Sequence, residues 1–409
     1  MYKKTIDPYL VFIVMALVIF GVVMISSVSV YPSFKVTSQM VARGILSEPS
    51  NSFYLTKNFV HVFISICVLI FFTKLSYTFL EKWNRLIIAA VLIVMMVVLL
   101  IGKEYNGARG WLDIPGLPSI QPVEFAKIGI IIFLASFMKK KRSLLPNFLE
   151  GTLPYFIIVA VLFLLLALQP DFGSILILAP VLLALYFVWG GNIRHIFLLF
   201  LIGGIGASSI YGMGKLGWSS WDSKSKLSYI SDRIDTFFQN NDILFSQKES
   251  DGKDYQIKQG LIAIGSGWFW GLGFGKSIQK FGYLPEVEGD FIFSVVVEEL
   301  WFIWALCLLS IYLSIVFRGY TIARAVKDPF GKYTAFGLST LILVQVFVNI
   351  WVNLNVVPLT WVTLPFVSYG GSSLVTLMIS VGILLNISRY TEYQSPSSNY
   401  SFVKKRRVY

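Results

Sequence analysis

Carboxylates interrupt an otherwise largely apolar stretch of the chain. Residues 281–300 read FGYLPEVEGDFIFSVVVEEL and include Asp290, Glu298 and Glu299. Apolar surroundings raise the pKa of a carboxyl group, as a general base that deprotonates an alcohol requires. Asp290 is therefore a candidate catalytic base, with a helix N-cap as the alternative. On an ideal helix Glu298 lies about 80° around the axis from Asp290 and Glu299 about 180° away, so Glu298 is expected to line the same cavity and Glu299 to face another helix.

A second group of polar residues lies in the segment QPVEFAK. Gln121, Glu124 and Lys127 recur every three residues, which places them along one side of a helix. One interpretation is a Glu124–Lys127 ion pair that neutralises itself near a helix end. The other puts Lys127 in an anion site, held by Glu124, with Arg109 of the upstream GARGW reaching the same mouth; two such cations suit a phosphate or pyrophosphate. Trp111 is expected at headgroup level, and contact with lipid headgroups is the alternative for Arg109.

The other residues that could do chemistry are isolated. Asp171 begins an apolar segment, where a helix N-terminus favours a carboxylate, so capping and a role in the site are equally expected. His61 and His195 stand alone, and Cys67 and Cys307 lie inside apolar runs. The sequence therefore predicts neither a disulfide framework nor a metal centre built from these residues.

The elements that must position these residues are membrane-spanning helices. Of the 409 residues, 56% are hydrophobic and 14% are charged, and the mean hydropathy is +0.71. This is too little charge to cover a soluble domain, so an all-α polytopic membrane protein is expected. Because a span needs about 20 mostly apolar residues, we predict about ten spans. The predicted spans are residues 8–30, 58–76, 86–102, 121–138, 152–169, 172–190, 195–213, 289–316, 334–356 and 368–388.

Positive charge sets the orientation of these spans. Basic residues cluster between alternate spans and in the tail, as in KKKR at 139–142 and KKRR at 404–407, and such clusters belong on the cytoplasmic side. Both termini are then cytoplasmic, and the large loop 214–288 between the seventh and eighth spans is extracytoplasmic. Residues 1–390 are interpreted as a single transmembrane domain and 391–409 as a flexible basic tail. Because this clustering explains the net charge of +12, no nucleic acid is expected as a partner.

Five motifs, in order over about residues 100–390, resemble those of the FtsW/RodA/SpoVE family. These SEDS proteins are the shape, elongation, division and sporulation glycosyltransferases. The motifs are GARGWLDIPGLPSIQPVEFAK at 107–127, LQPDFGS at 168–174, YQIKQGLIAIGSG at 255–267, KFGYLPEVEGDFIF at 280–293 and LPFVSYGGSSL at 364–374. Within the family, KFGYLPE is more similar to the FtsW and SpoVE members than to RodA.

The resemblance implies a function and a set of site residues. It implies polymerisation of lipid II into glycan strands at the outer face of the bacterial cytoplasmic membrane. The implied partners are a class B penicillin-binding protein (the transpeptidase), other divisome or elongasome membrane proteins, and membrane lipids. The family's essential Asp falls on Asp290, and a divalent cation, Mg or Mn, is the candidate cofactor, with no organic cofactor. The candidate substrate-binding residues are Arg109, Trp111, Glu124, Lys127, Asp171, Lys280 and Glu298.

The chain also departs from the family pattern, and rival functions stay open. The usual HTD before FIF reads Glu288-Gly289-Asp290, the second Arg of GARRW is Gly110, and Trp268 replaces a glycine of GSGG. An extra acid beside the presumed base would change its pKa or its metal preference. One rival is a flippase for the lipid-linked peptidoglycan precursor, which needs no base at its outer mouth. The other is a scaffold that only recruits division partners, which would leave the buried ionisable set unexplained.

Overall fold

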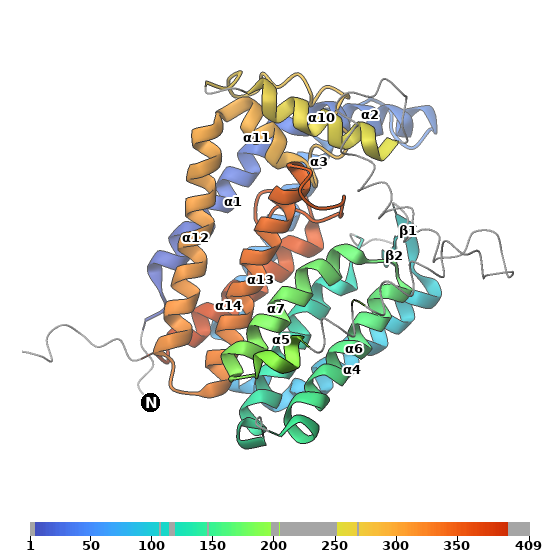
Figure 1. Ribbon diagram of the computed structural model, residues 1–409. Helices are drawn as coiled ribbons and strands as arrows, with labels where there is room; N and C mark the ends of the chain where they lie inside the picture. The colour runs from blue at the N-terminus through green and yellow to red at the C-terminus, as the bar shows by residue number, and fades with distance from the viewer. Residues whose placement is uncertain are drawn as a thin grey trace, which may run out of the picture.

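The long apolar segments form long helices that stand side by side in a bundle, as the computed structural model shows (Figure 1). The structure describes residues 5–105, 108–113, 119–144, 147–197, 204, 252–267 and 270–391. Within these residues, eight helices are long and apolar enough to cross a membrane. They are α1 (Pro8–Val28), α3 (Phe53–Lys74), α4 (Tyr77–Ile101), α6 (Leu153–Leu168) with the π-helical turn η2 (Phe148–Thr152) before it, α7 (Phe172–Trp189), α12 (Phe302–Ala325), α13 (Pro329–Asn353) and α14 (Gly371–Ser388). The prediction of an all-α polytopic membrane protein is confirmed.

Two of the predicted spans are not among these eight helices. The fourth is α5 (Pro122–Lys140), a 19-residue helix that packs against α4 and α13 but carries charged side chains at both ends. The seventh predicted span, 195–213, falls almost entirely outside the described residues, as does most of the large loop 214–288. The short turn η1 (Arg142–Leu144) follows α5.

The predicted eighth span, 289–316, is wrong. The chain instead forms the nine-residue helix α11 (Ile292–Leu300), breaks at Trp301 with φ +88°, and then begins the spanning helix α12. The break has a visible cause, because the carbonyls of Glu298 and Glu299 accept hydrogen bonds from the N–H groups of Leu272 and Gly273. These two carbonyl oxygens therefore bond to the loop instead of to a further helical turn, and α11 ends at Leu300. Hydropathy alone cannot register such a break, because α11 and α12 are both apolar.

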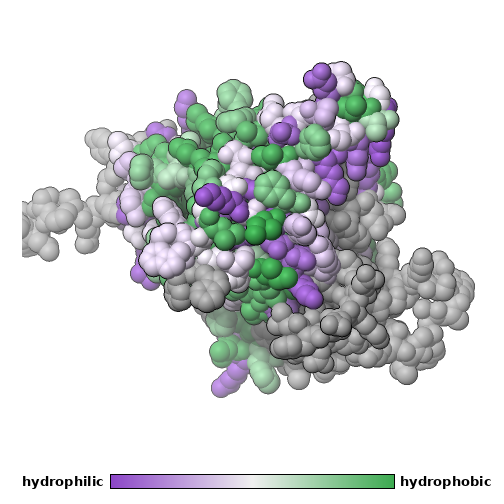
Figure 2. All heavy atoms as spheres, turned by 90° about the horizontal axis from the view of Figure 1, so that it is seen from above, coloured by the Kyte–Doolittle hydropathy of each residue, from purple (hydrophilic) through white to green (hydrophobic). Residues whose placement is uncertain are grey.

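Short elements gather at one end of the bundle. The helices α2 (Val30–Ala42), α10 (Gly252–Ser266) and α11 lie at this end, and the antiparallel hairpin of β1 (Lys103–Tyr105) and β2 (Ala108–Trp111) lies beside it (Figure 1). Seen from above, this end carries hydrophobic and hydrophilic side chains intermixed (Figure 2). The helix α2 was not predicted from the sequence.

The first and last described helices meet at the opposite end (Figure 1). The N–H of Asp7 donates to Oγ of Ser388 at 3.2 Å, which ties the start of α1 to the end of α14. Lys139 at the end of α5 lies 2.8 Å from both Glu81 and Asp328, so the start of α4 and the start of α13 are here as well. The basic residues of 139–142 therefore lie at the end of the bundle where α1 begins and α14 ends, and the charge rule for loops predicts that this end faces the cytoplasm.

The centre of the bundle is formed by α13 and α14. α13 packs against α5, α7 and α12, and α14 packs against α3. Small residues let these helices approach closely, since a Cβ at Gly337 would meet Ile131 at 2.7 Å and one at Gly319 would collide with Ser339. α13 ends and α14 begins at the site described below.

Candidate active site

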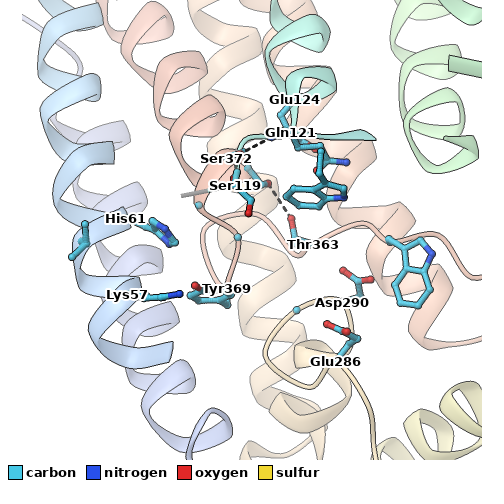
Figure 3. Close-up of a pocket in the computed structure, with 17 residues that line it drawn as sticks. Lys57, His61, Ser119, Gln121, Glu124, Glu286, Asp290, Thr363, Tyr369 and Ser372 are labelled. Carbon is cyan, nitrogen blue, oxygen red and sulfur yellow. Dashed lines mark hydrogen bonds between the residues drawn. The ribbon is translucent and has the colours of Figure 1, made fainter. Parts of the chain in front are cut away.

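A cavity of about 640 Å³ lies where α3, α5, α14 and the turn before α11 converge (Figure 3). One wall carries the carboxylates of Glu286 and Asp290, and the facing wall carries Lys57 and His61 of α3. Asp290 and Glu124 therefore meet at one cavity although they are more than 160 residues apart. Hydroxyl and amide groups between the walls come from Gln121, Thr363, Ser372 and Ser373.

The backbone at Asp290 is fixed by amide side chains of α13. Nδ2 of Asn349 and Nδ2 of Asn353 each donate to the Asp290 carbonyl at 2.9 Å. Oδ1 of Asn353 also accepts from the N–H and the hydroxyl of Ser294 in the first turn of α11. From the other side, the hydroxyl of Ser368 donates to the Gly289 carbonyl at 2.6 Å. These bonds hold the turn rigidly, so that the Asp290 side chain is presented to the cavity.

The Asp290 carboxylate is buried among other acids. It is 6% exposed and accepts no hydrogen bond from the described residues. Burial, together with the charges of Glu286 and Glu288, raises the pKa of Asp290 well above its usual range. Burial likewise raises the pKa of Glu286, and burial with the Glu286 charge raises the pKa of Glu288 to about 7. A carboxylate with a raised pKa is a stronger base, which is what abstraction of an alcohol proton requires.

The alternative role for Asp290 is wrong. The N-cap of α11 is Phe291, and no side chain caps this helix. Asp171, by contrast, does cap a helix. Its Oδ1 accepts from the N–H of Ser174 at 3.0 Å and its Oδ2 from the Ser174 hydroxyl at 2.8 Å, and it does not line the described cavity.

The polar face of α5 forms the predicted ion pair. Nζ of Lys127 lies 2.7 Å from Oε1 of Glu124, and both residues are buried. Glu124 lines the cavity, whereas Lys127 does not. The N–H of Gln121 donates to Oγ of Ser372 at 3.1 Å, which joins the start of α5 to the start of α14. Trp111 of β2 also lines the cavity.

Like Asp171 and Lys127, two further predicted site residues do not line the cavity, and the side chain of a third is not described. Glu298 and Lys280 do not line the cavity. Oε1 of Glu298 accepts the N–H of Ile278 at 3.0 Å, and Nζ of Lys280 donates to Glu299 at 2.8 Å, so both hold the loop before residue 281 onto α11. The expectation that Glu298 shares a cavity with Asp290 is wrong, because it assumed one continuous helix. Glu299 faces α1, as expected, and accepts the hydroxyl of Ser27 at 2.9 Å. The side chain of Arg109 lies outside the described residues.

Several cavity residues were missed in the sequence analysis. Lys57 and His61 are four residues apart, so they share one face of α3, and this spacing was a signal in an otherwise apolar segment. Tyr369 belongs to the SYGGSS motif, and its N–H donates to the Glu288 carbonyl at 2.7 Å. Glu286 is part of the same acidic turn as Asp290, and only the fold shows that its side chain lines the cavity.

The acids do not form a ready metal centre. Among the described residues, no group of three or more His, Cys, Asp or Glu side chains is placed to hold a metal ion. The divalent cation therefore stays a prediction, and we derive no chemical step through it.

Comparison with known proteins relates the whole chain to one family. The family model described as "Cell cycle protein", which covers FtsW, RodA and SpoVE, matches residues 8–393. Stage V sporulation protein E of Bacillus subtilis is 33% identical over 394 residues, which cover 96% of this chain and 99% of that protein. The probable peptidoglycan glycosyltransferase FtsW of Bacillus subtilis is also 33% identical, over 96% of this chain and 94% of that protein.

Solved structures share the fold. A chain from a peptidoglycan synthase complex, solved in work on the structural coordination of polymerization and crosslinking, aligns with a TM-score of 0.71 at 25% identity over 95% of this chain and 99% of that chain. The rod shape determining protein RodA of Thermus thermophilus aligns with a TM-score of 0.65 at 26% identity over 95% of this chain and 98% of that chain. The extent of the family match and the identity to two relatives establish that this chain belongs to the FtsW/RodA/SpoVE family of cell cycle proteins.

Proposed function

We propose that this protein is a peptidoglycan glycosyltransferase that polymerises lipid II at the outer face of the cytoplasmic membrane. Relatives that are 30–33% identical over most of both chains are named probable peptidoglycan glycosyltransferases. The observation that carries the proposal is Asp290, a buried carboxylate with a raised pKa that faces a cavity large enough for sugar residues. A flippase or a scaffold has no use for such a base.

The proposed reaction is a single displacement. Asp290 accepts the proton of the acceptor sugar's 4-hydroxyl, and the oxygen attacks the anomeric carbon of the donor. The bond from that carbon to the diphosphate oxygen breaks, and undecaprenyl diphosphate leaves with the electron pair. One base suffices for a displacement with inversion, so the remaining acids need not act as nucleophiles. Glu124, Trp111 and Gln121 are placed to contact the sugars, since they line the same cavity.

The setting of the reaction follows from the fold. The chain is a multi-pass protein of the bacterial cytoplasmic membrane. The cavity lies at the starts of α5 and α14, whereas the basic residues of 139–142 lie at the end of α5 and just after it, so the charge rule for loops supports an outer position for the cavity. A class B penicillin-binding protein is the proposed partner, because a similar chain belongs to a peptidoglycan synthase complex that polymerises and crosslinks. Glycan made here would pass directly to the transpeptidase.

The test separates polymerisation from transport. The protein, co-purified with its cognate penicillin-binding protein, is given lipid II in detergent, where no membrane separates two compartments, and glycan length is read on a gel. Glycan chains are the expected result. Absence of glycan, together with transbilayer movement of lipid II in liposomes that hold the same protein, would contradict the proposal and favour the flippase.

A further inference from the structure

The N-terminus of α14 opens into the cavity without a cap. Its N-cap residue is Gly370, no side chain caps the helix, and no acid lies in its first turn. The N–H of Leu374 donates to the Gly370 carbonyl, but the N–H groups of Gly371, Ser372 and Ser373 have no backbone partner in the described chain. All three residues line the cavity. Free N–H groups at the positive end of a helix dipole attract an anion.

The neighbouring N-terminus of α5 differs in one respect. Glu124 lies in its first turn, and an acid at that position already interacts favourably with the helix dipole. An anion beside the first turn of α5 would therefore be repelled by Glu124, whereas the first turn of α14 carries no acid.

His61 provides an independent indication of a ligand at this corner. It is 8% exposed, its Nδ1 has no hydrogen-bond partner, and its Nε2 receives or donates no bond among the described residues. The ring points from α3 toward the start of α14 (Figure 3), and a Cβ at Gly371 would lie 2.8–3.0 Å from its atoms. Of the two ring nitrogens, Nε2 is the one beside Gly371, and an anion at the start of α14 would accept a hydrogen bond from it.

Lys57 adds a positive charge to the same corner. It lies one helical turn before His61 on α3 and lines the cavity. Its amine lies 4.2 Å from the ring centroid of Phe53 and has no acidic partner within the described part of the chain. The carboxylates of Glu286 and Asp290 lie on the opposite wall (Figure 3).

We infer that the α14 N-terminus, His61 and Lys57 form the subsite that holds the diphosphate of the donor lipid. The inference rests on the proposed function and assigns one group of its substrate. In a displacement with inversion, the base and the leaving group lie on opposite faces of the anomeric carbon. The cavity offers this arrangement, because Asp290 is on one wall and the donors are on the other. The phosphate of a membrane phospholipid has the same chemistry, so the test must tell the two apart.

The test measures binding rather than turnover. Affinity for labelled undecaprenyl diphosphate is measured with the complex in phosphatidylcholine nanodiscs, for wild type, Lys57→Met and His61→Phe. Lys74→Met is the matched control, because Lys74 is an exposed lysine at the other end of the same helix. We expect each cavity variant to weaken binding about tenfold or more, as for loss of a hydrogen bond to a charged group, and the control to bind as wild type does.

A further variant tests the contact between His61 of α3 and Gly371 of α14. Gly371→Ala keeps the backbone N–H groups but places a methyl group against the His61 ring. It should weaken binding in the wild-type background and have little further effect beside His61→Ala, which leaves room for the methyl group.

The outcomes are distinct. Equal binding by Lys57→Met, His61→Phe and wild type would overturn the subsite but leave the polymerase proposal, which glycan formation tests separately. Competition by phosphatidylglycerol as strong as that by unlabelled undecaprenyl diphosphate would assign the corner to headgroups and would also overturn the inference. Diphosphate binding that needs both side chains, in a protein that makes no glycan, would support the subsite and refute the polymerase.

Discussion

Replacing Lys280 with Met should release the loop that holds α11 in place. Nζ of Lys280 lies 2.8 Å from Glu299, whose side chain is fully buried. Glu299 also accepts the hydroxyl of Ser27 and the N–H groups of Gly275 and Ser277. Met keeps most of the side-chain volume but leaves the buried carboxylate without its cation, which costs about 3–5 kcal/mol of folding free energy. With an unfolding entropy of about 2.1 cal/mol/K per residue over 409 residues, the melting temperature should fall by roughly 4–6 °C.

The assay is thermal unfolding of the purified complex, followed by intrinsic tryptophan fluorescence. Lys276→Met is the matched control, because Lys276 is an exposed lysine in the same loop, and it should melt within about 1 °C of wild type. The double variant Lys280→Met/Glu299→Gln should recover much of the loss, since no charge is then left unpaired. If Lys280→Met melts like Lys276→Met, the buried ion pair does not anchor the loop and the reasoning fails.

Four further predictions concern the acids and their partners. Glu288→Gln removes a negative charge that raises the pKa of Asp290, so the acidic limb of the pH profile of kcat/KM for glycan formation should move to lower pH; an unmoved limb would show that the two acids are not coupled. Glu288→Gln should also make the free energy of unfolding, measured by melting at several pH values, less dependent on pH. Burial and the Glu286 charge raise the pKa of Glu288 from 4.5 to about 7 in the folded protein. The folded wild type therefore binds more protons than the unfolded chain between these pH values, and its stability falls as pH rises from about 4.5 to about 7. Asp171→Ala should cost about 1 kcal/mol by removing the cap of α7, whereas Asp171→Asn should not; equal melting temperatures would argue against capping. Lys127→Met should destabilise more than Lys127→Met/Glu124→Gln, as measured by melting, because only the single variant leaves a buried charge unpaired.

Much of the architecture could be predicted because membrane-spanning helices leave a strong signal. Long apolar runs and clustered lysines follow from the absence of water in the bilayer and from the charge rule for loops. The Glu124–Lys127 pair could be predicted for a similar reason, since residues three apart on a helix are neighbours. These are local properties, and the structure confirms them.

The predictions that were wrong concern features that are set by contacts between distant segments of the chain. The end of α11 is set by loop N–H groups at Leu272 and Gly273, which take the carbonyls of Glu298 and Glu299. No local pattern predicts these contacts. Glu298 was placed in the wrong environment because Asp290 precedes the first residue of α11 and because the N–H of Ile278 binds the Glu298 carboxylate. The position of Asp290 depends likewise on Asn353 of α13. Lys57 and His61 did carry a local signal, since their four-residue spacing puts them on one face of a helix. Only the packing of α14 against α3 shows that this face lines the cavity.

The most direct test of the account compares Asp290→Asn with Glu288→Gln in the lipid II polymerisation assay. Both variants remove one carboxylate charge from the same turn, and both are assayed as complexes with wild-type melting temperatures. If Asp290 is the general base, Asp290→Asn should lose at least about 10²-fold in rate, while Glu288→Gln should stay within several-fold of wild type at its own pH optimum. Glycan formation by Asp290→Asn at the wild-type rate would contradict the central claim.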